Sequence, residues 1–298
     1  MSAVESIRLL PSENSLDLLT GFGSVLSGHV PESRTDEFFT DSHDALWSEL
    51  VGGGWFAIGA TDDAGADLDL RDLLEFSEGW GRAIVPLPFV TTMLCVRWGL
   101  ADAEPRAPLT VALAATGGRG VILHSERPGT LVLAADETFA PVGAEGTVDA
   151  FAPSLPLRDV DWQSPLTERQ AAELRACLAA EGVGAAQKAM ELGVAYAKIR
   201  EAYGQPIGSF QAVKHRLANI KRDVELARSA AVWAAQDVPG RQNRDASAMS
   251  LELSQRAASS TLQVFGGIGF TWDLELHFFL RHIVSVRRVV GALTHAHG

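Results

Sequence analysis

The strongest constraint on the fold is an apolar repeat in the second half of the chain. The repeat consists of Phe210, Val213, Leu217, Ile220 and Val224, which alternate three and four residues apart. This spacing places the side chains on one face of a helix, as in helices that pack together in bundles. The segment therefore predicts a bundle helix.

Further helices are predicted on both sides of this one. A long helix should run from about residue 167 to 200, with Ser164 as its N-cap and Pro165 at its first position. The turn at 204–208 ends it, and two more helices are expected over about 245–264 and 274–290, the first preceded by a loop at 239–244. Four helices with short connections predict an antiparallel bundle over residues 164–298.

The first half of the chain has a different character. Helical periodicity over residues 44–50, 68–81 and 89–100 predicts an N-terminal helical domain, residues 1–106. Short β-like runs divided by Gly and Pro lie between residues 109 and 162. They are too few for a full sandwich or barrel, so we expect a reduced β domain over 107–163. The predicted fold class is α+β, mainly α.

Composition excludes several classes of function. The formal net charge of −12 argues against a nucleic-acid partner, and no apolar run approaches the roughly 20 residues of a membrane span. The N-terminus lacks the features of a signal peptide. Cys95 and Cys177 sit in apolar helical contexts without metal-type spacing, and His282, His295 and His297 are interpreted as an exposed polar tail. We therefore expect a reduced, cytoplasmic protein without a metal site.

Two segments carry residues suited to a nucleotide pyrophosphate. Gly266 and Gly267 could bring backbone N–H groups close to phosphate oxygens, with the Gln263 amide one helical turn earlier. Arg200 offers a planar guanidinium fork, and Gln211 begins the next predicted helix. Taken singly, each feature is also explained by a tight turn or by a favourable charge at a helix end.

The full strings around these residues closely resemble the acyl-CoA dehydrogenase family. The first runs from Tyr196 to Ala218 and the second from Gln263 to Thr271, followed by Arg281. The Gly79-Trp-Gly-Arg-Ala stretch is also similar to the family, so the resemblance covers most of the chain. It implies an α domain, a β domain and a C-terminal four-helix bundle. It also implies FAD at a subunit interface, where a second subunit's bundle grips the ADP portion.

The same resemblance assigns roles to residues of this sequence. Arg200, Gln211, Gln263 and Gly267 match family positions that reach across to the FAD of a neighbouring subunit. Tyr203 matches a position usually held by Phe, which can pack on the cofactor. With Gly266 of the glycine turn, these residues form the predicted FAD-binding set.

The catalytic base of the family is missing at both positions where its members carry it. The reaction removes a proton from the carbon α to a thioester carbonyl, for which a carboxylate is the usual base. Alignment on Arg281 places one base position at Val290, and alignment on Tyr196 places the other at Leu174. Neither side chain can accept a proton. Glu173 is adjacent, but one residue turns about 100° around a helix, so we expect it to face elsewhere.

The predicted β domain also departs from the family. It lacks the Thr-Glu-Pro-x-x-Gly-Ser-type stretch and the Trp-bearing strand that lie against the flavin ring. These departures favour a short subunit with no catalytic residue of its own, similar to the base-lacking subunit of the α2β2 dehydrogenases of actinobacterial steroid side-chain degradation. The expected partners are a longer dehydrogenase-like subunit with the catalytic Glu, an acyl-CoA substrate of steroid type, and an electron-transfer flavoprotein.

Two alternatives remain open from the sequence. One is a homo-oligomeric acyl-CoA dehydrogenase whose base lies at Glu173 or elsewhere. The other is a non-catalytic scaffold subunit that binds no flavin. Flavin bound by the isolated chain would favour the first, and an Arg200 variant with unchanged flavin content would favour the second.

Overall fold

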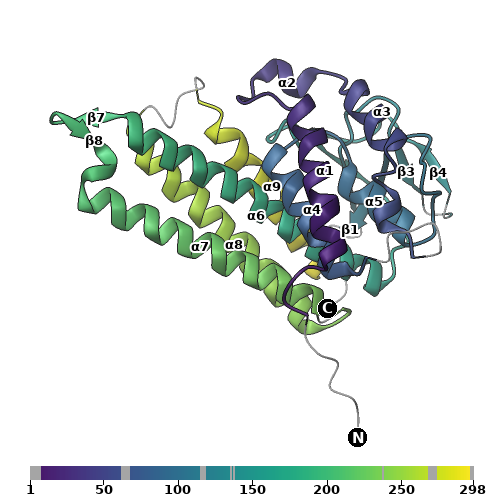
Figure 1. Cartoon of the computed structure of the whole chain (residues 1–298). Coiled ribbons are helices and arrows are strands. Elements are labelled where there is room, and N and C mark those ends of the chain that lie inside the picture. The colour runs from purple at the N-terminus through teal and green to yellow at the C-terminus, as the bar shows by residue number, and fades with distance from the viewer. Residues whose placement is uncertain are drawn as a thin grey trace, which may run out of the picture.

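A computed structural model describes residues 8–61, 68–114, 119–134, 136, 138–236, 238–267 and 274–295. Long helices form an elongated bundle, and the N-terminal helices and a sheet cover one end of it (Figure 1). A short β-hairpin projects from the opposite end. The fold class predicted from the sequence, mainly α with a small sheet, is confirmed.

The N-terminal part consists of short helices around an aromatic core. They are α1 (Glu13–His29), α2 (Asp36–Thr40), α3 (Asp44–Gly52), the 3₁₀ helix Ala57–Gly59, α4 (Leu70–Ala83) and α5 (Phe89–Arg97). The cap of α4 is a capping box, in which the side chains of Asp69 and Asp72 each accept the other's backbone N–H. Phe22 of α1 packs edge-on against Phe76 of α4, with ring centroids 5.5 Å apart. This contact packs α1 against α4.

The sheet has six described strands in the order β4-β3-β1-β2-β6-β5. Their bounds are β1 (Leu109–Ala114), β2 (Gly120–Leu123), β3 (Leu131–Leu133), β4 (Phe139–Pro141), β5 (Val148–Asp149) and β6 (Leu157–Val160). Only the pair β1–β3 is parallel among the described pairings. Ser164 follows the last strand, where its Oγ accepts from Ala112 N at 2.8 Å and donates to Leu133 O at 2.5 Å. Ser164 thus ties the segment after β6 to strands β1 and β3.

The prediction that Ser164 caps the long helix is therefore wrong. The N-cap of α6 (Glu168–Ile199) is Thr167, which forms a capping box with Gln170. The following elements are the hairpin β7 (Glu201–Ala202) and β8 (Gln205–Pro206), the 3₁₀ helix Ile207–Ser209, α7 (Gln211–Gln236), α8 (Arg241–Phe265) and α9 (Leu276–His295). Helix α8 begins at Arg241, so the predicted loop over 239–244 is mostly helical.

Helices α4 and α6 approach closely enough to exclude side chains at their crossing. A Cβ on Gly184 of α6 would lie 1.9 Å from the carbonyl oxygen of Glu78, and one on Gly81 of α4 would lie 1.9 Å from that of Glu181. Reciprocal glycines therefore let the two backbones touch, and this crossing joins the N-terminal helices to the bundle. In the described part of the chain, no helix has the length and apolar character needed to cross a membrane.

Candidate functional site

Arg200 lies at the C-terminal end of α6, where the chain turns into the β7–β8 hairpin. As the C-cap residue it donates its backbone N–H to Tyr196 O at 2.9 Å. Its own carbonyl oxygen accepts from Ile207 N at 2.7 Å, across the hairpin. The side chain of Arg200 is exposed, so its guanidinium is open to a ligand or a partner.

The other predicted FAD-binding residues lie at the same end of the bundle. Gln211 is the first residue of α7 and Gln263 lies in the last turn of α8, and both side chains are exposed. Gly266 is the C-cap of α8 with φ +65°, a conformation that glycine adopts without strain. Gly267 is exposed as well, and a Cβ there would meet nothing within 4 Å. The rest of the predicted glycine turn lies outside the described residues.

Tyr203 occupies the tip of the hairpin between β7 and β8. Tyr203 is 98% exposed, and its backbone has a left-handed conformation, with φ +53°. Its one described ring contact is an edge-on approach to Phe210, with centroids 6.2 Å apart. An aromatic ring so placed has its face available to a flat ligand or to another protein.

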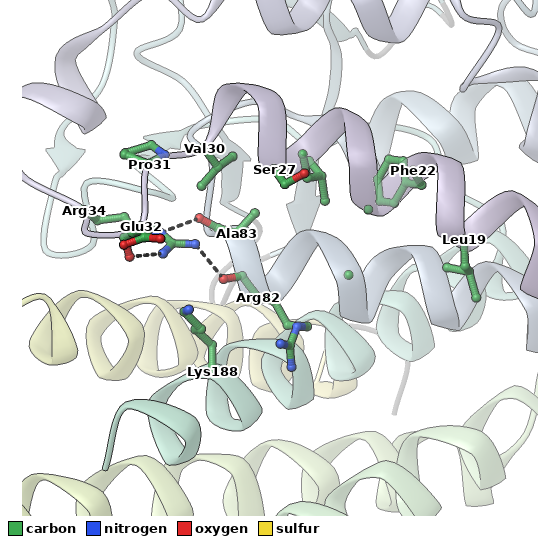
Figure 2. Close-up of a pocket in the computed structure, with 13 residues that line it drawn as sticks. Leu19, Phe22, Ser27, Val30, Pro31, Glu32, Arg34, Arg82, Ala83 and Lys188 are labelled. Atoms are coloured by element: carbon green, nitrogen blue, oxygen red, sulfur yellow. Dashed lines mark hydrogen bonds between the residues drawn. The ribbon is translucent and has the colours of Figure 1, made fainter. Parts of the chain in front are cut away.

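These six residues are all exposed at the surface of the bundle end. A groove of about 340 Å³ lies elsewhere, between α1 and α4, with Lys188 of α6 on its far wall (Figure 2). None of the six predicted residues lines this groove. The groups present nevertheless suit an ADP moiety: a guanidinium fork, two amides and an open glycine turn.

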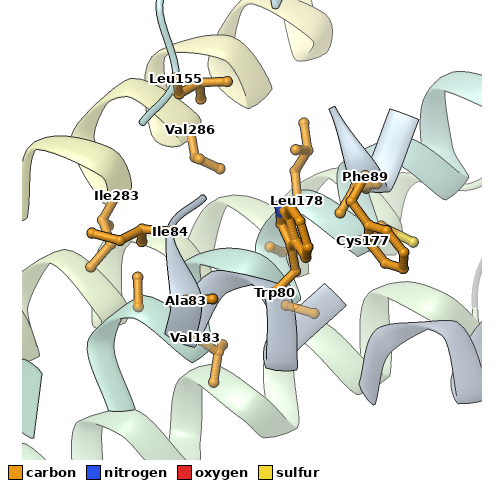
Figure 3. Packing of buried hydrophobic residues seen from close by; sticks show 14 of the residues in the cluster. Trp80, Ala83, Ile84, Phe89, Leu155, Cys177, Leu178, Val183, Ile283 and Val286 are labelled. Carbon is orange, nitrogen blue, oxygen red and sulfur yellow. The ribbon is translucent and has the colours of Figure 1, made fainter. Parts of the chain in front are cut away.

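The two positions where the family carries its catalytic base are buried in the apolar core. Leu174 of α6 is 0% exposed and Val290 of α9 is 1% exposed. Both belong to the main hydrophobic core, in which Trp80, Leu178 and Val286 pack between α4, α6 and α9 (Figure 3). Burial at both positions is thus what the structure adds to their identity, and the absence of a base there stays a prediction from the sequence.

Glu173 is the remaining carboxylate near these positions, and it is fully engaged. Its Oε2 accepts from Trp98 Nε1 at 2.8 Å and lies 3.5 Å from Arg97 Nε. Its Oε1 accepts from Arg169 Nε at 3.2 Å. The residue is 4% exposed, and two of its three partners lie at the end of α5. That Glu173 faces away from the position of Leu174 stays a prediction.

The prediction of an exposed polar tail is wrong for His282. This residue is 0% exposed on α9, with Nδ1 2.9 Å from Ser154 Oγ and Nε2 3.0 Å from Glu181 Oε1. The sequence signal that could have identified this cluster is Glu181, a single charge inside the apolar run of α6. The side chains of His295 and His297 lie outside the described residues.

Burial also sets the ionisation of His124 and the two cysteines. Desolvation, with a smaller contribution from the nearby charge of His282, lowers the pKa of His124 to about 3, so this imidazole stays neutral. Desolvation raises the pKa of both Cys95 and Cys177 to about 12. Both cysteines are free, buried thiols, as the sequence suggested. Among the described side chains, no group of His, Cys, Asp and Glu could hold a metal ion.

Comparisons with known proteins agree with this architecture. The model of the acyl-CoA dehydrogenase C-terminal domain matches residues 165–292. Acyl-CoA dehydrogenase FadE34 of Mycobacterium tuberculosis is 31% identical over 294 residues, which cover 86% of this chain and 41% of FadE34. Acyl-CoA dehydrogenase IpdE2 of Mycolicibacterium smegmatis is 30% identical over 263 residues, covering 83% of this chain and 82% of IpdE2.

The fold is also that of a solved structure, the Tcur3481-Tcur3483 steroid ACAD G363A variant. The two chains superpose with a TM-score of 0.72 over 95% of each, at 23% sequence identity. A C-terminal bundle, a small sheet and an N-terminal helical part together define a flavoprotein dehydrogenase fold. The chain belongs to the acyl-CoA dehydrogenase family, whose members are FAD-dependent oxidoreductases that act on CH–CH bonds.

Proposed function

We propose that this chain is the base-lacking subunit of a heteromeric acyl-CoA dehydrogenase. One contrast carries the proposal: the predicted FAD-binding residues are exposed at one end of the bundle, whereas both base positions, Leu174 and Val290, are buried among apolar side chains. A chain with this arrangement can contribute cofactor contacts to a neighbour but has no proton acceptor at those positions. A longer subunit of the same family would supply the catalytic Glu.

In this proposal each residue has a binding role and none has a proton-transfer role. The Arg200 guanidinium holds a phosphate oxygen of the ADP portion, and Gly266 and Gly267 let backbone N–H groups approach the pyrophosphate. The amides of Gln211 and Gln263 bond adenine or ribose edges, and Tyr203 covers the cofactor. Bound FAD would supply the hydride acceptor for the β carbon, and a carboxylate of the partner would supply the base for the α proton.

The substrate class proposed is a CoA thioester with a bulky, steroid-derived acyl group. Support comes from the Tcur3481-Tcur3483 steroid ACAD, which has this fold. Because both base positions of this chain are buried in its core, the acyl group would bind on the partner's side of the interface. The electron acceptor proposed is an electron-transfer flavoprotein, as the family resemblance implies, and the proposed compartment is the cytoplasm.

The homo-oligomeric alternative gains no support from Glu173. Trp98, Arg97 and Arg169 surround its carboxylate, and the residue is almost fully buried. A general base must reach the proton that it abstracts, and a carboxylate held by two hydrogen bonds and an ion pair would have to give up these contacts first.

The experiment is to measure flavin absorbance of the chain purified alone and after co-expression with a longer dehydrogenase-like subunit. We expect a colourless chain alone and a yellow complex with one FAD per pair of unlike subunits. Arg200→Ala should lower the FAD content of the complex. The matched control is Arg241→Ala, which removes an exposed arginine at the opposite end of α8 and should leave FAD content unchanged.

Each other outcome has a definite meaning. A yellow, active chain on its own would replace the proposal with the homo-oligomeric enzyme. A complex whose FAD content does not respond to Arg200→Ala would refute the cofactor role and favour the scaffold alternative.

A further inference from the structure

The last turns of α6 and α8 are joined by a pair of stacked aromatic rings. The ring centroids of Tyr196 and Phe265 lie 4.3 Å apart with an interplanar angle of 22°. One turn earlier, Gly193 faces Thr261, and a Cβ on Gly193 would lie 2.6 Å from Thr261 Cγ2. The absence of a side chain at Gly193 therefore lets the two helices approach closely enough for the rings to stack.

Each ring is connected through a short stretch of backbone to one half of the predicted FAD-binding set. Tyr196 accepts the backbone N–H of Arg200 in the final turn of α6, at 2.9 Å. Phe265 is the last residue of α8, directly before Gly266 and two positions after Gln263. The stack is therefore a direct contact between the segment that carries the guanidinium and the segment that carries the glycine turn.

The surroundings of these two segments make the stack important for their spacing. Arg200, Gln263 and Gly266 are all exposed. Phe265, in contrast, is 8% exposed, and Tyr196 is half-buried against the core. A binding site holds its ligand tightly only when supporting residues keep its groups within about 0.5 Å of the required geometry.

We propose that Tyr196 and Phe265 are positioning residues, which set the separation between the Arg200 guanidinium and the glycine turn for the ADP portion of FAD. This inference rests on the proposed function. Neither ring contacts the cofactor in this arrangement. The stacked pair acts through the segments that follow it, so its loss should weaken the adenine side of the site and leave the flavin side unaffected.

The test uses the co-expressed complex with Tyr196→Ala, Tyr196→Phe and Phe265→Leu. Tyr196→Ala should raise the Kd for FAD about tenfold, a change of about 1.4 kcal/mol. Tyr196→Phe keeps the ring and should retain the original Kd. Phe265→Leu keeps apolar volume without the stack and should weaken FAD binding in the same direction. Thermal unfolding and size-exclusion chromatography identify any variant that fails to fold or assemble.

A second readout separates positioning from general damage. FMN has the flavin ring but lacks the adenine half of FAD, so its Kd for the complex should stay unchanged in Tyr196→Ala. Equal weakening of FAD and FMN would overturn the inference, as would an unchanged Kd for FAD in both Tyr196→Ala and Phe265→Leu. If Arg200→Ala also has no effect on FAD, the proposed function itself fails. If only Arg200→Ala weakens binding, the positioning role alone is wrong.

Discussion

His282 of α9 and Glu181 of α6 form a buried polar contact, with Nε2 and Oε1 3.0 Å apart and side-chain exposures of 1% and 3%. On the other side of the imidazole, Nδ1 lies 2.9 Å from Ser154 Oγ, in the loop before β6. The imidazole thus connects two bundle helices and the sheet. Polar groups at such a junction stabilise the arrangement only when their partners are present.

Removing one member of this pair should destabilise the protein strongly. Glu181→Gln leaves the imidazole of His282 without its carboxylate in a site closed to water. We expect the free energy of unfolding to fall by about 3 kcal/mol, measured by urea denaturation. The matched control is Arg241→Ala, which breaks an ion pair with Asp245 whose side chains are 87% and 71% exposed. Equal, small effects of both substitutions would show that the buried pair contributes little.

The crossing of α4 and α6 gives a second prediction. Gly184→Ala places a methyl group where the Glu78 carbonyl oxygen lies, so the helices must separate. The expected loss of stability is about 3 kcal/mol, because backbone atoms cannot move aside as a flexible side chain can. Gly23→Ala in α1 is the control, since its Cβ would meet nothing within 4 Å. It should stabilise the helix by about 0.5–1 kcal/mol in the same thermal or urea unfolding assay.

The pH dependence of stability should contain a contribution from His124. Its pKa is about 3 in the folded protein and about 6.5 in the unfolded chain, so the unfolded state binds the extra proton between these values. Stability is therefore lost as the pH falls below about 6.5, at about 1.4 kcal/mol per pH unit.

His124→Asn should make the stability curve flatter below neutral pH. Asn tolerates the left-handed backbone at this position, where φ is +51°. The measurement is the free energy of unfolding at neutral and mildly acidic pH for both proteins. His215→Asn, which changes an exposed residue of α7, should leave the slope unaltered. A slope that is identical in His124→Asn and the unmodified protein would contradict the assignment.

Restoring a carboxylate at the family's base position should not create an enzyme. Val290→Glu places an ionisable group in a site that is 1% exposed and filled by apolar neighbours. We expect no turnover of any acyl-CoA by the isolated variant, and a lower unfolding midpoint because the carboxyl group is desolvated. Arg287→Glu, at a half-exposed position on the same helix, controls for added negative charge. Measurable dehydrogenation by Val290→Glu would contradict the filled-site interpretation.

The helices of the bundle could be predicted because each apolar repeat ends where a run of turn-forming residues begins. The predicted 167–200 and the observed Glu168–Ile199 agree almost residue for residue, since Thr167 starts the helix and the hairpin ends it. Helix α8 was placed about four residues too late, because polar residues 241–244 resemble a loop. Asn243 is in fact buried, and its amide bonds the carbonyl oxygens of Ala172 and Ala234. Tertiary partners of this kind do not appear in local sequence patterns.

The candidate site was likewise predictable in part, through its motifs, and in part not. The six proposed cofactor residues were identified by motif resemblance. The structure shows that these residues are exposed at one end of the bundle, and their roles stay predictions. The Tyr196–Phe265 stack was not predicted, because the two rings are 69 residues apart in the chain and meet only through the packing of α6 and α8. The His282 cluster was missed for the same reason. The aromatic stack and the His282 cluster both depend on contacts between segments that are far apart in the sequence.

The hairpin that carries Tyr203 at its tip is also the only chain connection between α6 and α7. Lys198 and Arg200 beside it are exposed, so a trypsin-like protease could cut the chain at this connection. A partner that covers this end would shield the same bonds. If the chain pairs with a longer subunit as proposed, the end of the bundle that binds the cofactor would also determine how long the unassembled chain survives proteolysis.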